Sequence, residues 1–254
     1  MAYKQVSIIT KRWKGLKPPV GSQIDWGHPL AKGLVGVWIL NNGLKSTEIM
    51  KSLIPTVAGA PQYVSKTKGT GIRFPSTNDL LTYDIADQPT NQAFSLMIMA
   101  RVEDTTTTNR KRAIRVFGAN GSSFQIEFQP SSIAEDTCIS SGMQWTAGSF
   151  DSIGVSEGAP GYLANTDYNI ACVWKPGVQL IQYVNGVIKG KETNIRTTLT
   201  NVTQVSLGGN TSGGGLNLRG TLYFAYYWNR ALSSQEIQQL YQEPYCFIKP
   251  FIRR

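Results

Sequence analysis

The sequence of 254 residues contains few charged residues, three cysteines and a single histidine, and each shortage argues against a class of protein. Charged residues make up 16%, below the average of about 25%, which disfavours a bundle of long amphipathic helices. The cysteines are odd in number and far apart, so neither a disulfide framework nor a zinc site is expected. No stretch approaches the ~20 apolar residues of a membrane span, and the apolar run at residues 6–9 is too short for a signal peptide. We expect a chain that is made in a cytoplasm, keeps reduced thiols and has no membrane partner.

What the chain does contain is typical of a globular β protein. Its hydrophobic content of 41% is enough for a sizeable core in one or two domains, and 25 glycines among many Thr, Ser and Asn residues favour short strands and turns. Apolar and polar residues alternate along residues 94–102 and again along residues 124–129, which predicts two strands that each bury one face.

Two local motifs predict one hairpin and one helix. Asn185-Gly186 lies between apolar runs and predicts a β-hairpin with a type I′ turn. Ser233 and Glu236 form the pattern of a capping box, which predicts a short helix that ends before Pro244. Many short strands and one late helix predict an all-β fold, a two-sheet antiparallel sandwich of jelly-roll type with one short C-terminal helix.

The formal net charge of +9 is concentrated at the two ends of the chain. Residues 1–24 hold five basic residues and residues 244–254 hold three, neither stretch has an acid, and removing these eight from +9 leaves +1 for the body. We therefore expect an extended basic N-terminal arm (1–25), a β-sandwich domain (26–243) and a basic C-terminal tail (244–254). The side chains predicted to bind a partner are Lys4, Lys11, Arg12, Trp13, Lys14, Lys17, Tyr245, Phe247, Phe251, Arg253 and Arg254. The body shows no basic strand interleaved with aromatics, so a nucleic-acid partner is not expected.

Three stretches in the second half of the chain resemble a known family. Residues 183–190 (YVNGVIKG), 205–210 (VSLGGN) and 220–241, which include NRALS followed by Glu236 and Ile237, resemble the C-terminal half of laminin-G-like domains. These domains belong to the concanavalin A-like lectin/glucanase superfamily. The resemblance covers roughly residues 30–243 and implies a concanavalin A-like jelly roll, whereas function has to be argued from the site residues.

The flanks of this region resemble laminin-G-like proteins of tailed bacteriophages. They are residues 26–34 (WGHPLAKGL) and 240–250 (LYQEPYCFIKP). The resemblance implies a virion structural protein, a capsid decoration, head-fibre or tail-associated protein that is attached through its terminal arms. It also implies viral capsid or tail proteins as partners, a homo-oligomer, and a virion location after synthesis in the host cytoplasm.

The residues offer little support for catalysis. Retaining glucanases of this superfamily use a Glu-x-Asp-x-x-Glu strand, and no glutamate here is followed two residues later by an acid. The nearest approaches are Glu127 and the Glu135-Asp136 pair. Residues 154–158 match Gly-x-Ser-x-Gly, but Ala-Pro-Gly follows where a nucleophile elbow needs a helix. We expect no enzymatic activity.

Metal and sugar sites have weaker signals. The resemblance implies a Ca²⁺ site at the rim of the sandwich, with Asp79 as the candidate ligand and Asp84 and Asp87 nearby; the alternative is that Asp79 caps a turn. We expect no other cofactor. Trp145 and Tyr162 are candidates for a sugar-binding surface, but burial or a place in an interface is the alternative for both, and we assign no sugar-binding site.

Four functions remain to be compared. The leading hypothesis is the non-catalytic virion protein, and the alternative is a carbohydrate-binding adhesin that recognises host-surface glycans. An enzyme acting on polysaccharide and a protein that contacts nucleic acid through its arms are less well supported.

Overall fold

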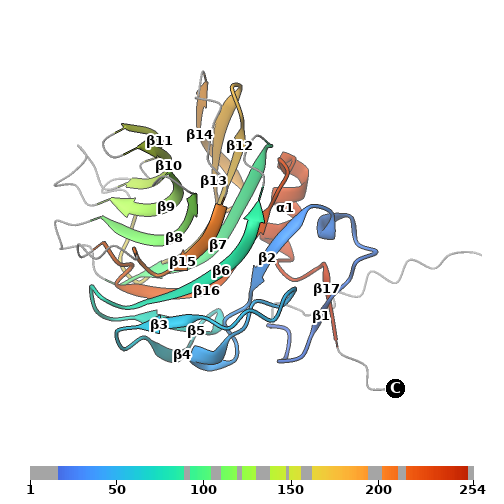
Figure 1. The fold of residues 1–254 in the computed structure, drawn as a ribbon, viewed down its shortest axis with the longest axis vertical. Coiled ribbons are helices and arrows are strands. Elements are labelled where there is room, and N and C mark those ends of the chain that lie inside the picture. The colour runs from blue at the N-terminus through green and yellow to red at the C-terminus, as the bar shows by residue number, and fades with distance from the viewer. Residues whose placement is uncertain are drawn as a thin grey trace, which may run out of the picture.

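The structure is a computed structural model that describes residues 17–88, 92–103, 110–118, 122–129, 138–146, 149–155, 162–193, 202–210 and 216–250. It confirms the predicted all-β fold, with two large antiparallel sheets that pack face to face (Figure 1). None of the helices in these ranges has the length and apolarity that a membrane-spanning segment needs.

The two large sheets have non-consecutive strand orders, as a jelly roll requires. The seven-stranded sheet runs in the order β11 (Ser149–Val155), β10 (Cys138–Thr146), β9 (Ser123–Gln129), β8 (Lys111–Gly118), β15 (Val202–Leu207), β6 (Leu80–Gln88) and β3 (Thr56–Ala58). The eight-stranded sheet runs in the order β14 (Val187–Thr193), β13 (Gln179–Val184), β12 (Asp167–Lys175), β7 (Phe94–Val102), β16 (Gly220–Trp228), β5 (Gly69–Phe74) and β4 (Gln62–Lys66), and β2 (Leu34–Trp38) also pairs with β16.

The main core lies between these sheets and follows the alternation read from the sequence. All five apolar residues of one face of β7 belong to it, and so do Phe124, Ile126 and Phe128 of β9. The odd-numbered residues of β9 consequently point to the outward face of the seven-stranded sheet, away from this core.

Both local motifs have the predicted geometry. Asn185 and Gly186 have φ angles of 51° and 79°, the positive values of a type I′ turn between β13 and β14. The capping box of helix α1 (Ser234–Gln242) is complete, because the Glu236 N–H donates to Ser233 Oγ and the Ser233 N–H donates to Glu236 Oε2. The turn packs against the helix, since a Cβ built on Gly186 would lie 2.8 Å from Tyr241 Cδ1.

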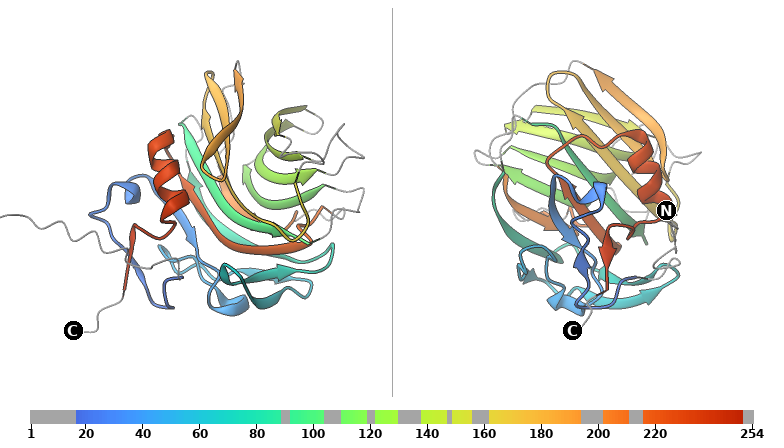
Figure 2. Two further views of the ribbon diagram at one scale, coloured as in Figure 1. Left: turned by 180° about the vertical axis from the view of Figure 1, so that it is seen from behind. Right: turned by 90° about the vertical axis from the view of Figure 1, so that its right-hand side faces the viewer.

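A third layer covers the outward face of the eight-stranded sheet, and the terminal segments build much of it (Figure 2). We call it the terminal layer. The short strands β1 (Gln23–Ile24) and β17 (Ile248–Lys249) pair antiparallel. Beside them lie α1 and the 3-10 helix η1 (Pro29–Ala31); a second 3-10 helix, η2 (Gly43–Lys45), lies near β4 and β5. A second hydrophobic cluster joins this layer to residues of β16, β12 and β7.

This layer corrects the domain boundaries expected from the sequence. Residues 17–25 and 244–250 belong to the folded body instead of to extended arms, because the outward face of β16 is apolar and needs a cover. Tyr245 and Phe247 are buried, with Phe247 0% exposed, so they are not exposed anchors in a flexible tail. The Phe247 ring centroid lies 5.2 Å from that of Tyr226 and 6.1 Å from that of Trp228.

Lys17 is also held by its own chain. Its Nζ donates to the carbonyl oxygens of Ile39, at 2.7 Å, and Tyr223, and it lies over the Tyr223 ring at 5.7 Å from the centroid. Burial lowers the pKa of Lys17 to about 7. Its predicted role in partner binding is replaced by an anchoring role at the start of the folded body. The other predicted partner-binding residues, Lys4, Lys11, Arg12, Trp13, Lys14, Phe251, Arg253 and Arg254, lie outside the described residues.

Candidate ligand-binding face

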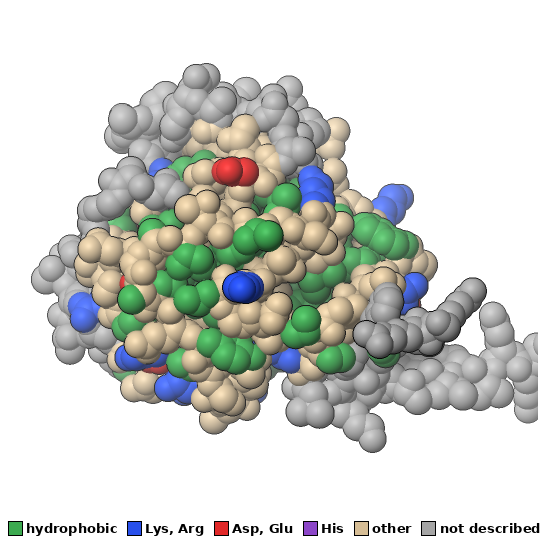
Figure 3. All heavy atoms as spheres, turned by 60° about the horizontal axis from the view of Figure 1, so that its bottom comes forward, with side chains coloured by type: hydrophobic (Ala, Val, Ile, Leu, Met, Phe, Trp, Pro, Cys, Tyr) green, Lys and Arg blue, Asp and Glu red, His purple; other side chains and the backbone are tan. Residues whose placement is uncertain are grey.

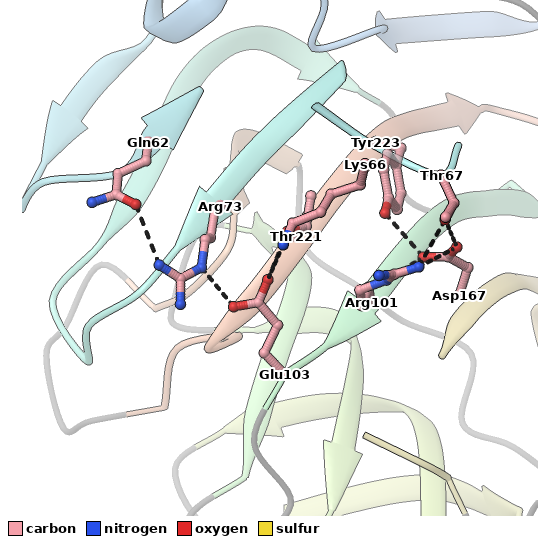
Figure 4. A network of polar contacts seen from close by, with 9 residues as sticks. All are labelled: Gln62, Lys66, Thr67, Arg73, Arg101, Glu103, Asp167, Thr221 and Tyr223. Atoms are coloured by element: carbon pink, nitrogen blue, oxygen red, sulfur yellow. Dashed lines mark hydrogen bonds and ion pairs between the residues drawn. The ribbon is translucent and has the colours of Figure 1, made fainter. Parts of the chain in front are cut away.

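The part of the eight-stranded sheet next to the terminal layer is occupied by a network of charged side chains (Figure 4). Arg101 of β7 donates from Nε and Nη2 to the two carboxylate oxygens of Asp167, each at 2.7 Å. The hydroxyl groups of Tyr223, at 3.0 Å, and Thr67, at 3.0 Å, donate to the same carboxylate. Burial alone would raise the pKa of Asp167, but these bonds outweigh it and lower that pKa.

The other half of the network centres on Glu103. Its carboxylate accepts from Arg73 Nε at 2.5 Å and from Thr221 Oγ1 at 3.2 Å, and Lys66 Nζ lies 3.7 Å away. Arg73 also donates to Gln62 at 3.3 Å (Figure 4). Because the acids and bases of this network satisfy one another, it braces β4, β5, β7, β12 and β16 and is a poor candidate for ligand binding.

The outward face of the seven-stranded sheet is different, because part of its polar surface is accessible. Phe117 of β8 is paired with Gln204 of β15, which is paired with Asp84 of β6, so the three side chains form one row across the sheet. Phe117 and Gln204 are half-buried and Asp84 is exposed. Gln204 Nε2 donates to Asp84 Oδ1 at 2.9 Å. We call Phe117, Gln204 and Asp84 the outer row.

Arg115, two residues before Phe117 on β8, lies on the same outward face next to the outer row and is buried. The Arg115 guanidinium lies 4.4 Å from the centroid of the Phe117 ring, and its Nη1 donates to Asn210 Oδ1. Burial, and then the charge of Arg112, lower the pKa of Arg115 to about 10 although Glu127 opposes the shift. The stacked guanidinium fixes the orientation of the ring that the outer row presents.

Glu127 lies deeper on the same face and is the carboxylate that comes nearest to a catalytic candidate. It accepts hydrogen bonds from Gln125 at 3.0 Å, Gln129 at 2.8 Å and Arg112 at 3.3 Å, and Arg110 Nη1 is 3.4 Å away. The residues paired with it on the two neighbouring strands are Arg112 and Ser140. A retaining glycosidase needs a second carboxyl group about 5 Å away, and an arginine and a serine occupy the cross-strand positions that would supply it. Glu135 and Asp136 lie outside the described residues, as do residues 156–158 of the Gly-x-Ser-x-Gly match.

Asp79 is a fully buried turn residue. Its Oδ1 accepts from the Ala60 N–H and its Oδ2 from the Ser76 N–H, each at 2.6 Å, and its carbonyl oxygen accepts from Asn217. Both carboxylate oxygens are therefore engaged by backbone donors, which favours the capped-turn alternative over a Ca²⁺ ligand. Asp84 lies on the outward sheet face, and across the described ranges no group of three or more His, Cys, Asp or Glu residues is placed to hold a metal ion.

The aromatic residue that the structure places on this face, Phe117, is not one that the sequence suggested for sugar binding. Tyr162 is 1% exposed and packs in the core, with its ring centroid 5.2 Å from that of Phe128, which is the burial given as its alternative. The side chain of Trp145 lies outside the described residues. Phe117 was missed, although Ile114 and Val116 alternate with Arg115 and Phe117 and so place the last two on the opposite face.

Comparison with known proteins identifies the fold of the chain that carries this face. The model of a family described as the concanavalin A-like lectin/glucanases superfamily, Laminin_G_3, matches residues 66–238. Among curated proteins, none matches the chain.

Similar solved structures include two toxin domains and one domain of a glycosidase. The binding domain of botulinum neurotoxin serotype D/C VPI 5993 is 14% identical, with a TM-score of 0.64 over 83% of this chain and 52% of that chain. The binding domain of Paraclostridial Mosquitocidal Protein 1 is 13% identical, with a TM-score of 0.65 over 85% and 53%. Domain 4 of AbnA, an extracellular arabinanase from Geobacillus stearothermophilus solved in complex with arabinotriose, is 17% identical, with a TM-score of 0.61 over 82% and 98%. The chain spans about half the length of the two toxin domains, and at these identities the likeness shows the fold alone.

Proposed function

Since this chain belongs to the concanavalin A-like lectin/glucanase superfamily, we propose that it is a non-catalytic domain that binds carbohydrate on the outward face of its seven-stranded sheet. The observation that carries the proposal is the outer row. An aromatic ring beside an amide and a carboxylate offers an apolar surface for the C–H face of a sugar and planar polar groups for its hydroxyls. The domain of the arabinanase, which matches over nearly its whole length, was solved with an oligosaccharide bound and supports this reading.

Binding to an oligosaccharide array, followed by calorimetric titration of the best ligand, tests the proposal. We expect Phe117→Ala and Gln204→Ala each to weaken binding about tenfold or more, because each removes a contact in the outer row. Val187→Ala is the matched control, since Val187 is exposed on β14 of the other sheet. The proposal is wrong if no oligosaccharide binds at millimolar concentration, or if the outer-row variants bind as tightly as the control.

A second candidate function is attachment to a virion as a structural protein. The pairing of Gln23 with Lys249 brings the two terminal segments of the body together, and the sequence beyond them holds six basic residues and no acid. Basic segments that leave the body from paired strands suit a docking site on an acidic lattice of capsid or tail proteins, in which the chain is a homo-oligomer. Deletion of residues 1–15 and 251–254 should leave the body folded and abolish incorporation into particles. Normal incorporation of that variant rules this attachment out.

A further inference from the structure

The face on which both large sheets reach their last strand carries exposed apolar side chains. β3 ends the strand order of one sheet and β4 ends that of the other, and residues 59–61 connect the two strands directly. Figure 3 shows separate hydrophobic side chains spread over this face, with a Lys or Arg side chain among them and further charged groups towards its margin. The most exposed members near β3 and β4 are Ile54, Val57 and Tyr63, at 75%, 41% and 47%. We call these three residues the edge patch.

An apolar patch beside two open strand edges is a surface that a protein normally covers. Among the described strands, β3 and β4 each pair with a neighbour on one side only. Exposed apolar side chains next to such an edge promote pairing with another segment. β4 carries one lysine, Lys66, whose side chain is drawn towards Glu103 by the network on the sheet face.

The folded body begins next to this patch. The Pro18 carbonyl oxygen accepts from Asn41 Nδ2, and the Asn41 carbonyl oxygen accepts from the Tyr63 hydroxyl at 2.9 Å. One asparagine therefore connects the start of the described chain to a member of the edge patch. The two hydrogen bonds of the Lys17 side chain hold the first described residue to the folded body.

The preceding 16 residues have the composition of a segment that covers such a patch. They contain Tyr3, Val6, Ile8, Ile9, Trp13 and Leu16, with basic residues between them. The run at residues 5–10 (QVSIIT) is rich in strand-forming residues. Trp13 precedes Lys17 by four positions and has a reach of about 13 Å from it in an extended chain.

We propose that residues 1–16 dock on the edge patch of their own chain, with Trp13 as the main anchor. Connection through the fixed Lys17 gives the segment a high effective concentration at its own patch, which favours this occupant over a second copy at low protein concentration. A buried tryptophan supplies most of the contact area, and the basic side chains of the segment remain in solvent. The proposal does not depend on carbohydrate binding, although β3 of the edge patch pairs with β6, which carries Asp84 of the outer row.

Cysteine labelling of the full-length protein tests the proposal. Ile54→Cys places a thiol in the edge patch, and Val187→Cys places one on an exposed strand at a distance from it. Unmodified protein gives the background, because Cys138 and Cys172 are buried and Cys246 is half-buried. We expect a maleimide to label Ile54→Cys at least about fivefold more slowly in the full chain than in a chain without residues 1–15, and Val187→Cys equally in both.

Two further variants identify the anchor and the occupant. Trp13→Ala should release the protection of the Ile54→Cys thiol, and Lys11→Ala, in the same segment, should keep it. Equal labelling of the full and shortened chains overturns the proposal, and so does protection that survives Trp13→Ala. Protection that grows between about 1 and 100 µM protein also overturns it, because the occupant is then a neighbouring copy.

Discussion

Replacement of Phe247 by alanine tests whether the C-terminal segment is part of the folded body. The segment was expected from its sequence to be an exposed tail, in which this substitution would leave stability unchanged. In the structure the side chain is fully buried, and edge-to-face contacts join it to Tyr226 and Trp228 of β16.

The expected loss of stability follows from that burial. Truncation of a fully buried phenylalanine removes its transfer free energy and leaves a cavity, which together cost about 3–5 kcal/mol. Each lost aromatic pair accounts for about 0.5–1.5 kcal/mol of this, so two pairs contribute up to about 3 kcal/mol. We therefore expect Phe247→Ala to lower the free energy of unfolding by about 3–5 kcal/mol.

Denaturation in guanidinium chloride, followed by circular dichroism and tryptophan fluorescence, measures the change. Val187→Ala serves as the control, because Val187 is exposed and its truncation should change the free energy of unfolding by less than about 0.5 kcal/mol. A Phe247→Ala variant as stable as this control would refute the assignment of residues 244–250 to the folded body.

Three further predictions concern other parts of the body. Because burial lowers the pKa of Lys17 to about 7 from 10.5, the unfolded chain binds more protons than the folded chain between these values. The free energy of unfolding should therefore rise with pH across that window in titrated denaturation curves, and rise less in Lys17→Met. Glu127→Ala should cost about 3–5 kcal/mol in the same assay, because it leaves the buried Arg112 without its carboxylate, and a loss below about 1 kcal/mol would contradict this. Gly186→Val should lower the melting temperature, since the turn needs a positive φ and the added Cβ meets Tyr241; an unchanged melting temperature would contradict the turn geometry.

The elements that the sequence predicted correctly are those whose cause is local. The alternation along β7 requires no knowledge of the sheet to which the strand belongs, and the same holds for Asn185-Gly186 and for the capping box of Ser233 and Glu236. In each case a few neighbouring residues determine the backbone conformation, so the sequence and the structure agree.

The terminal layer was missed because its cause is not local. Residues 245–248 (YCFI) form a short apolar run after a proline and have no periodicity of their own. They are buried because β16 has apolar side chains on both faces, and all nine of its residues are buried. A signal was present in the sequence: residues 220–228 (GTLYFAYYW) do not alternate, and a strand buried on both faces of a sandwich requires a further layer. The apolar stretches at the chain ends were the segments left to supply it.

The outer row could not be predicted from the sequence for a related reason. Phe117, Gln204 and Asp84 come from three strands that are not consecutive in the sequence, and their alignment depends on the register of β8, β15 and β6. That register includes an irregularity between Val202 and Gln204, which no pattern of apolar residues reveals. Each residue alone is an ordinary surface side chain, and the candidate site exists only once the three strands are paired.

The positions of the terminal layer and of the outer row restrict how these two parts of the molecule can work together. The terminal layer covers the outward face of the eight-stranded sheet, and the outer row lies on the outward face of the other sheet, so the main core separates them (Figure 2). A chain attached to a large assembly through its termini would therefore present the outer row away from that assembly. Because β16 contributes to both cores, damage to the terminal layer should lower the stability of the whole sandwich before it alters the outer row, whose strands β6, β8 and β15 all belong to the other sheet. The Phe247→Ala variant separates the effect on stability from the effect on binding. At low temperature, where this variant is still folded, it should bind oligosaccharide as tightly as the unmodified chain. Weakened binding would show that the two faces are coupled.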